Sequence, residues 1–180
     1  KYKNVFGTTP SISFYKTMGS TASSTPISNL GSALFDSYNF SNIRITWVND
    51  TYTQAFLTGH TNGNTNLAFS IEAETYLGAT IDGTGSTGAF ISYSGTNTQI
   101  VTVKNFLIQN FTGASSSRGI LVNNAAAQFV IQDCKIQDCS CTNGGGGMRV
   151  QAASASAGVV RNVWFLRCSS TLTTHGGGLL

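Results

Sequence analysis

The stretch that decides the fold is "IQDCKIQDCSCTNGGGGMRV", residues 131–150, in which the phrase IQDC occurs twice in succession. Apolar and polar residues alternate with a period of two, which is the pattern of a β-strand, and the glycine run marks a turn. The alternation predicts two faces for this strand, with Ile131, Asp133 and Lys135 on one and Gln132, Cys134 and Ile136 on the other. One-residue shifts of the phase predict bends between successive short strands.

The same phrase recurs along the chain at a nearly constant spacing. It ends at Phe111 (IQNF), Cys139 (IQDC) and Cys168 (FLRC), which gives spacings of 28 and 29 residues. A glycine followed by apolar residues recurs at Gly88, Gly119, Gly147 and Gly178. A repeat of about 30 residues, built from short strands and glycine turns, is typical of a stacked array in which each repeat forms one coil.

This repeat predicts an all-β fold, a right-handed parallel β-helix of about six coils with a repeat of about 28–31 residues. Neighbouring strands in such a stack lie about 4.8 Å apart, so Phe111, Cys139 and Cys168 are expected in one inward ladder. The glycines are expected to turn corners with positive φ and to let neighbouring backbones approach. Residues 1–40 are expected to be an irregular lead-in or N-terminal cap, and residues 41–180 the β-helix, which is expected to continue beyond them.

The composition favours a packed domain with a neutral polar surface. Only 9% of residues are charged, against roughly a quarter in an ordinary soluble domain. The hydrophobic content of 41% is high enough for a core. The ten basic residues are scattered, so no nucleic acid partner is expected. No apolar run reaches the roughly 20 residues of a membrane span.

The segments 131–150 and "VWFLRCSSTLTTHGGGLL" (163–180) resemble the repeats of polymorphic outer membrane proteins. Those repeats carry a strand with Asn-Cys or Phe-x-x-Asn/Cys, a polar linker, and then Gly-Gly-(Ala/Gly)-(Ile/Leu/Val). The match is good over 128–180, loose over 100–122 and absent before residue 88. The resemblance implies the β-helix fold of the pectin-lyase-like superfamily and a surface-exposed module used for adhesion or as a stalk. In the first half, "LGATIDGTGS" (77–86) resembles a phrase of pectin-degrading β-helix enzymes.

The four cysteines raise the question of a metal site or a disulfide: Cys134, Cys139, Cys141 and Cys168. Their C-x4-C-x-C spacing lacks the paired C-x2-C arrangement of zinc sites, and neither His60 nor His175 is placed as a fourth ligand. No metal and no cofactor is therefore expected. Two alternatives stay open, namely stacked reduced thiols in the core and a disulfide between neighbouring coils, for which Cys139 and Cys168 are the favoured pair.

The spacing of the carboxylates along the chain matches no arrangement of a polysaccharide-active enzyme. The seven residues are Asp36, Asp50, Glu72, Glu74, Asp82, Asp133 and Asp138. Glycoside hydrolysis needs two carboxyl groups that flank the scissile bond, and a polysaccharide lyase needs clustered acids for calcium beside a basic residue. Asp133 and Asp138 occupy repeat positions that hold asparagine in other coils, at Asn105, Asn110 and Asn162, which is typical of turn or ladder residues. Asp82 lies in the turn phrase IDGTG. No catalytic residue is therefore predicted.

Two further groups of residues bear on surface function. The aromatic residues Trp47, Tyr52, Tyr76 and Tyr93 can bind carbohydrate if exposed or pack in the core if buried. Sequons for N-glycosylation begin at Asn39, Asn49 and Asn110 and permit modification in a secreted protein.

Stacking accounts for everything that recurs in the chain, so the expected function is structural. We expect a non-enzymatic extracellular or cell-surface module that is structural or adhesive, a building block of a stalk or filament. Its partners would be other protein subunits or further coils, and surface carbohydrate. The alternatives are a polysaccharide-active enzyme, similar to pectin lyases or polygalacturonases, and a carbohydrate-binding β-helix.

Overall fold

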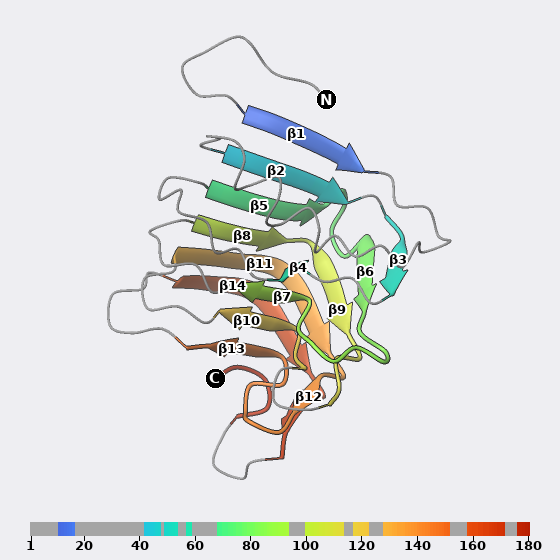
Figure 1. Ribbon diagram of the computed structural model, residues 1–180, viewed down its shortest axis with the longest axis vertical. Coiled ribbons are helices and arrows are strands. Elements are labelled where there is room, and N and C mark those ends of the chain that lie inside the picture. Colours follow the sequence, from blue (N-terminus) through green and yellow to red (C-terminus); the bar gives the residue numbers. More distant parts are fainter. Residues whose placement is uncertain are drawn as a thin grey trace.

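The protein is all-β in a computed structural model that describes residues 11–16, 42–47, 49–53, 57–58, 68–93, 100–113, 117–122, 128–151, 158–171 and 176–180. Within these ranges the chain forms strands and turns and no helix. Figure 1 shows the strands stacked side by side, with β1 at one end of the stack and β12 to β14 toward the other. The predicted all-β class is therefore confirmed for the described residues.

The largest sheet contains nine strands that form two rows. The first row runs β1 (Ser11–Lys16), β2 (Asn42–Trp47), β5 (Ala68–Ala73), β8 (Ile100–Lys104), β11 (Gln128–Gln137) and β14 (Gly158–Leu166). The second row runs β3 (Thr51–Thr53), β6 (Ala79–Asp82) and β9 (Phe106–Gln109), and joins the second half of β11. The long strands β11 and β14 thus belong to both rows.

Two smaller sheets complete the described structure. One contains β4 (Leu57–Thr58), β7 (Ile91–Tyr93), β10 (Ile120–Val122) and β13 (Met148–Val150). The other contains β12 (Ser140–Cys141) and β15 (Ser169–Ser170). All strand pairs in the three sheets are parallel. Parallel sheets of this kind are compatible with the predicted β-helix.

The register of the strands agrees with the repeat length read from the sequence. Leu107 of β9 pairs with Lys135 of β11, 28 residues later, and Lys135 pairs with Trp164 of β14, 29 residues later. In the first half of the chain the spacing is less regular, since Ser11 pairs with Asn42 and Asn42 with Ala68. Strand pairing therefore follows the repeated phrase where the phrase is clearest.

Strand β1 lies inside residues 1–40, for which the sequence predicts an irregular lead-in. All six residues of β1 pair in register with β2, so this part of the lead-in is a regular strand. The predicted boundary at residue 40 lies outside the described residues, as does the Asn39 sequon.

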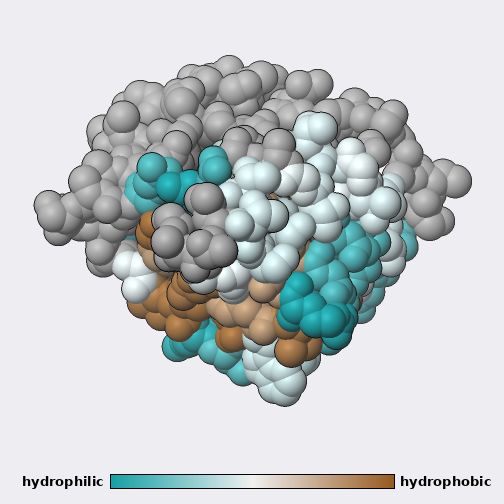
Figure 2. All heavy atoms as spheres, turned by 90° about the horizontal axis from the view of Figure 1, so that it is seen from below, coloured by the Kyte–Doolittle hydropathy of each residue, from teal (hydrophilic) through white to brown (hydrophobic). Residues whose placement is uncertain are grey.

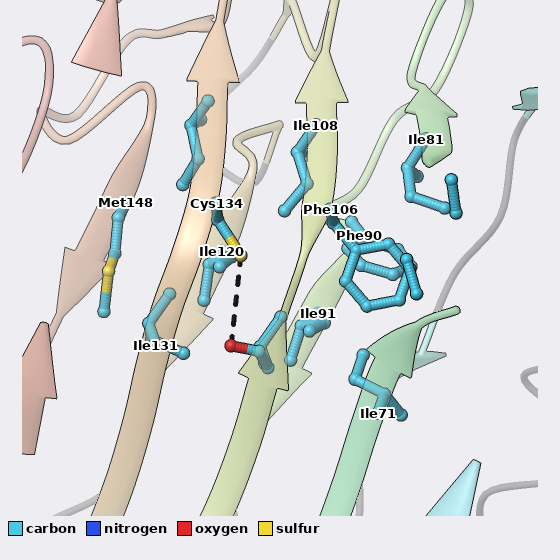
Figure 3. Close-up of a cluster of buried hydrophobic side chains, with 14 of the residues drawn as sticks. Ile71, Ile81, Phe90, Ile91, Phe106, Ile108, Ile120, Ile131, Cys134 and Met148 are labelled. Atoms are coloured by element: carbon cyan, nitrogen blue, oxygen red, sulfur yellow. Dashed lines mark hydrogen bonds between the residues drawn. The ribbon is translucent and has the colours of Figure 1, made fainter. Parts of the chain in front are cut away.

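The core lies between the largest sheet and the β4–β7–β10–β13 sheet. Figure 3 shows Ile71, Ile81 and Ile131 of the largest sheet near Ile91 and Ile120 of the other, each at most 3% exposed. Burial of one such side chain contributes about 1.5–3 kcal/mol to folding. Apolar residues on alternate strand positions therefore hold the two sheets together.

Two of the aromatic residues singled out in the sequence belong to this core. Trp47 and Tyr52 are each 3% exposed. The Trp47 ring meets Tyr52 at 4.7 Å, Phe106 at 5.8 Å and Phe90 at 5.9 Å between centroids, all edge-to-face. Neither residue is placed to stack on a surface ligand, so the packing alternative holds for both.

The predicted faces of the segment 131–136 are partly wrong. Ile131, Cys134 and Ile136 are all buried and belong to the same core cluster, although the alternation placed Ile131 opposite the other two. The reason is Asp133, whose φ of 55° reverses the phase of the strand in mid-course. The structure thus has the one-residue phase shift that the sequence predicts, and it lies at Asp133.

The repeated glycines serve close approach more than turning. A Cβ atom on Gly119 would lie 2.6 Å from the carbonyl oxygen of Gly147, and one on Gly147 would lie 2.7 Å from that of Gly178. Neither Gly119 nor Gly147 has a positive φ, whereas Gly144 and Gly145 do, at 83° and 62°. The prediction of positive φ at the corners is therefore correct for the turn before Gly147 and wrong for the repeated glycine itself.

Candidate functional site

Two columns of residues in the left-handed backbone region line the bends of the long strands. The first column consists of Asn105, Asp133 and Asn162, and the second of Asn110, Asp138 and Arg167, with φ between 49° and 68°. Asparagine and aspartate tolerate this region better than other non-glycine residues. The interpretation of Asp133 and Asp138 as turn residues is thus confirmed.

Side chains on these columns hydrogen-bond to one another along the stack. Asn162 Nδ2 donates to Asp133 Oδ1 at 2.8 Å. Arg167 donates to both oxygens of Asp138, from Nε at 2.5 Å and from Nη2 at 2.7 Å. Each carboxylate therefore accepts at least one hydrogen bond from the next repeat, and Asp133 also accepts one from Gln132 beside it at 3.1 Å.

Asp82 ends a similar ladder on β6 and β9. Its Oδ1 accepts from the Thr84 backbone at 2.9 Å and from the Thr84 hydroxyl at 2.6 Å. Its Oδ2 accepts from Gln109 Nε2 and Asn110 Nδ2, both at 3.1 Å. Gln109 in turn accepts from Gln137 Nε2 at 3.0 Å, which extends the ladder to β11.

The electrostatics of these acids do not suit general acid catalysis. Burial alone would raise the pKa of Asp82, but the hydrogen bonds from Thr84, Gln109 and Asn110 hold this pKa below its usual range. The hydrogen bond from Arg167 likewise lowers the pKa of Asp138. A general acid at neutral pH needs a raised pKa. Asp82 and Asp138 are therefore suited to hold the ladder together.

No metal site is formed within the part of the chain that the structure describes. There, no three His, Cys, Asp or Glu side chains gather in a group that could hold a metal ion. His60, His175 and Asp36 lie outside the described residues.

The predicted inward ladder of Phe111, Cys139 and Cys168 is confirmed. The Ser140 amide donates to the Phe111 carbonyl at 2.8 Å, and the Ser169 amide donates to the Cys139 carbonyl at 2.9 Å. Phe111 and Cys139 are fully buried, and Cys168 is half-buried against the same core.

The four thiols have different surroundings, and all four are free. Burial raises the pKa of Cys134 to about 12. A hydrogen bond between the Cys139 and Cys168 thiols raises the pKa of Cys139, which burial raises further, and lowers the pKa of Cys168. The two residues of the favoured pair lie side by side in neighbouring repeats, while the disulfide itself stays a prediction.

The two sequons in the described residues differ in access. Asn49 is exposed, and its side-chain oxygen accepts from the Thr75 hydroxyl at 3.1 Å. Asn110 is half-buried, precedes the fully buried Phe111, and uses its amide nitrogen for the bond to Asp82. Asn49 is therefore the more accessible of the two, and glycosylation at either stays a prediction.

One exposed aromatic residue, Trp164, is not among those that the sequence singled out. Trp164 on β14 is 59% exposed and pairs across the sheet with Lys135. Its neighbours Val163 and Phe165 are partly buried against the core, so Trp164 faces outward. The alternation in "NVWFL" was the available signal. Tyr76 is also exposed, at 55%, and the side chain of Tyr93 lies outside the described residues.

The end of the stack at β14 carries several apolar side chains, and Figure 2 shows brown areas there beside teal and white ones. We call terminal face the group of Val160, Val163, Phe165, Leu179 and Leu180. Leu179 is 45% exposed and Leu180 37%. β14 pairs with β11 along one edge, and no strand among the described residues pairs with its other edge.

The described residues include no helix with the length and apolarity to cross a membrane. Comparison of the chain with protein-family models, with curated proteins and with solved structures finds no match.

Proposed function

We propose that the chain is a right-handed parallel β-helix that serves as a non-enzymatic structural or adhesive module outside the cell, and that it associates end to end. The observation that carries this proposal is the terminal face. The ladders support it as well, because Asp82, Asp133 and Asp138 are engaged by neighbouring repeats.

β14 has a parallel strand on one edge alone among the described residues, whereas β11 has parallel strands on both edges. Ile131 and Ile136 of β11 are at most 1% exposed because β14 lies beside them. Their partners on β14, Val160 and Phe165, are only partly buried. A further parallel strand with apolar residues at the same positions would cover them, at a gain of up to about 1.5–3 kcal/mol for each side chain fully buried.

β14 also lacks the features that protect the edges of β-sheets. Such edges commonly carry inward-pointing charges, proline or very short strands. β14 is nine residues long and its inward positions are Val160, Val163 and Phe165. Its cation Arg161 donates to Gln132 Oε1 of β11 at 2.6 Å and 3.1 Å, and so turns toward the stack. These features favour pairing with a further parallel strand, which a further coil or a second copy of the chain can supply.

Self-association can be tested by placing charge on the exposed part of the terminal face. The variant Leu179→Lys should stay monomeric where the unmodified chain associates with rising concentration, because an ammonium group would have to be desolvated. Leu179 pairs with the fully buried Met148 of the repeat before it, so the charge lies at the end of the stack. Sedimentation velocity measures the mass, and far-ultraviolet circular dichroism checks the fold. Thr171→Lys, exposed on the same repeat but outside the face, is the matched control. An unmodified chain that is monomeric at every concentration would exclude the proposal.

Carbohydrate binding is a second candidate, favoured by the exposed Trp164. An exposed indole offers a flat apolar surface to a sugar ring. Gln137, which hydrogen-bonds to Gln109, and Lys135, the partner of Trp164, lie on β11 beside β14 and offer donors for hydroxyl groups. This arrangement supports binding of a polysaccharide along the outer face of β9, β11 and β14.

Trp164→Ala tests the carbohydrate candidate. Loss of the indole should weaken binding to immobilised pectin, alginate or chondroitin at least about tenfold, which is 1.4 kcal/mol. Tyr76→Ala, an exposed aromatic on the turn between β5 and β6, is the control and should bind like the unmodified chain. Equal binding by all three proteins would reject a site at Trp164. Release of reducing ends or unsaturated uronates would instead favour a polysaccharide-active enzyme.

A further inference from the structure

Cys139 and Cys168 lie in direct succession in the ladder, in neighbouring repeats. The backbone bond from Ser169 to Cys139 places the two residues side by side. The Cys168 sulfur lies 3.5 Å from the Ile136 carbonyl oxygen, and the Cys139 sulfur lies 3.2 Å from the Gln137 carbonyl oxygen, so both reach the end of β11. Parallel strands are about 4.8 Å apart, within the 4.4–6.8 Å between Cα atoms that a disulfide requires.

The two sulfurs differ in access. Cys139 is 0% exposed, whereas Cys168 is half-buried. The hydrogen bond from Cys139 favours the thiolate of Cys168 and lowers the pKa of Cys168. Cys168 is therefore the thiol that reacts with an external disulfide. Cys139 is the thiol that then attacks the mixed disulfide on Cys168.

We propose that Cys139 and Cys168 form a redox centre that closes to a disulfide and fastens the β14 repeat to the β11 repeat. The proposal does not depend on the function proposed above. It selects one of the two alternatives left open by the sequence and adds an order of reaction.

The reaction takes a small disulfide, such as glutathione disulfide, as its oxidant. The Cys168 thiolate attacks one sulfur of the oxidant, forms a mixed disulfide and releases one glutathione thiolate. The sulfur of Cys139 then attacks the sulfur of Cys168 and displaces the second glutathione, whose thiolate takes up the proton that Cys139 loses. Two protein thiols are oxidised, and one disulfide of the oxidant is reduced to two thiols.

The other two cysteines lack a cysteine neighbour across the strands. Cys134 pairs with Val163, and its sulfur lies 3.2 Å from the Gln132 carbonyl oxygen. Cys141 pairs with Ser170, and its thiol donates to the Gly144 carbonyl at 2.9 Å. Both are at most 1% exposed. They are therefore the natural controls for Cys139 and Cys168.

The disulfide would close a loop that contains β12, β13 and β14. Such a crosslink restricts the unfolded chain and so favours the folded state. Gly147 leaves the room that this arrangement needs, because a Cβ there would lie 3.1 Å from the Cys168 sulfur. Oxidation should therefore raise the melting temperature by several degrees and protect the β14 repeat from proteolysis.

The test is oxidation of the folded full chain by glutathione disulfide, followed by thiol counting in denaturant. The thiols should fall from four to two, and peptide mapping should find Cys139 linked to Cys168. Cys134→Ser and Cys141→Ser should each form the same crosslink. Cys139→Ser should keep one glutathione on Cys168, whereas Cys168→Ser should gain neither crosslink nor glutathione.

Three results would overturn the proposal. They are retention of all four thiols in the unmodified chain, a crosslink that includes Cys134 or Cys141, and a glutathione adduct that persists on Cys168 although Cys139 is present. The first and third are read on the unmodified chain, so they remain decisive even if a serine variant fails to fold.

Discussion

Phe106→Ala is expected to lower the free energy of unfolding by about 3–5 kcal/mol, the range for deletion of a buried phenylalanine side chain. Phe106 is 0% exposed. Its ring lies 5.8 Å from Trp47 and 5.5 Å from Phe90, so it contacts both the first row of the largest sheet and the segment that leads into β7. The truncation therefore leaves a cavity where the two sheets meet, and it removes two aromatic pairs worth about 0.5–1.5 kcal/mol each.

Equilibrium unfolding in urea, followed by far-ultraviolet circular dichroism, measures this loss. Leu107→Ala is the matched control, because Leu107 is the next residue of the same strand and points outward, where it is only half-buried. Its loss should stay below about 1 kcal/mol, since it gives up part of one side-chain transfer and leaves no cavity. Equal losses at the two positions would contradict the assignment of Phe106 to the core.

The sequence predicted strand pairing best where one repeat copies another. Phe111, Cys139 and Cys168 share a phrase, and the structure stacks them, because parallel strands bring like positions of successive repeats together. The exchange of asparagine and aspartate at Asn105, Asp133 and Asn162 likewise predicted turn or ladder residues, and the structure has all three in the left-handed region.

The positions that the sequence did not predict depend on neighbours that are distant in the chain. Whether Trp47 faces the core depends on Phe90 and Phe106, which cover its ring and lie more than 40 residues away in the chain. Leu77 and Arg167 also escaped prediction, because neither residue type favours the left-handed region that both adopt.

Arg118 is buried although the repeat has glycine at the equivalent positions. It corresponds to Gly146 and Gly177, since it precedes Gly119 as they precede the next repeated glycines. Its side chain is 1% exposed and donates from Nη1 to the Gly144 carbonyl at 3.3 Å. Burial lowers the pKa of this guanidinium. A charged residue in the core cannot be inferred from a position that holds glycine elsewhere.

For the variant Gly146→Val, the repeat pattern and the atomic contacts give opposite predictions. Since Arg118 occupies the equivalent position, the repeat alone predicts that a side chain is tolerated at 146. The contacts predict the reverse, because a Cβ on Gly146 would lie 2.3 Å from the Ser169 carbonyl oxygen and 2.7 Å from that of Cys139. Both atoms belong to the backbone and cannot turn aside as a side chain can, so β15 would have to move away from Gly146. We expect a loss of about 1–3 kcal/mol or more from overpacking.

Hydrogen exchange locates the effect of Gly146→Val. The amide of Ser169, bonded to Cys139, and the amide of Gly147, bonded to Gly177 at 3.0 Å, should exchange faster, because both bonds join the last repeat to the one before it. The amide of Ile120, bonded to Gly147 at 3.0 Å, should change less, since that bond joins two earlier repeats. Thr142→Val adds no buried atoms, because Thr142 is exposed on the same turn, and serves as the control. Unchanged exchange at Ser169 in the Gly146→Val variant would mean that the repeat pattern, and not the close contact, governs what position 146 accepts.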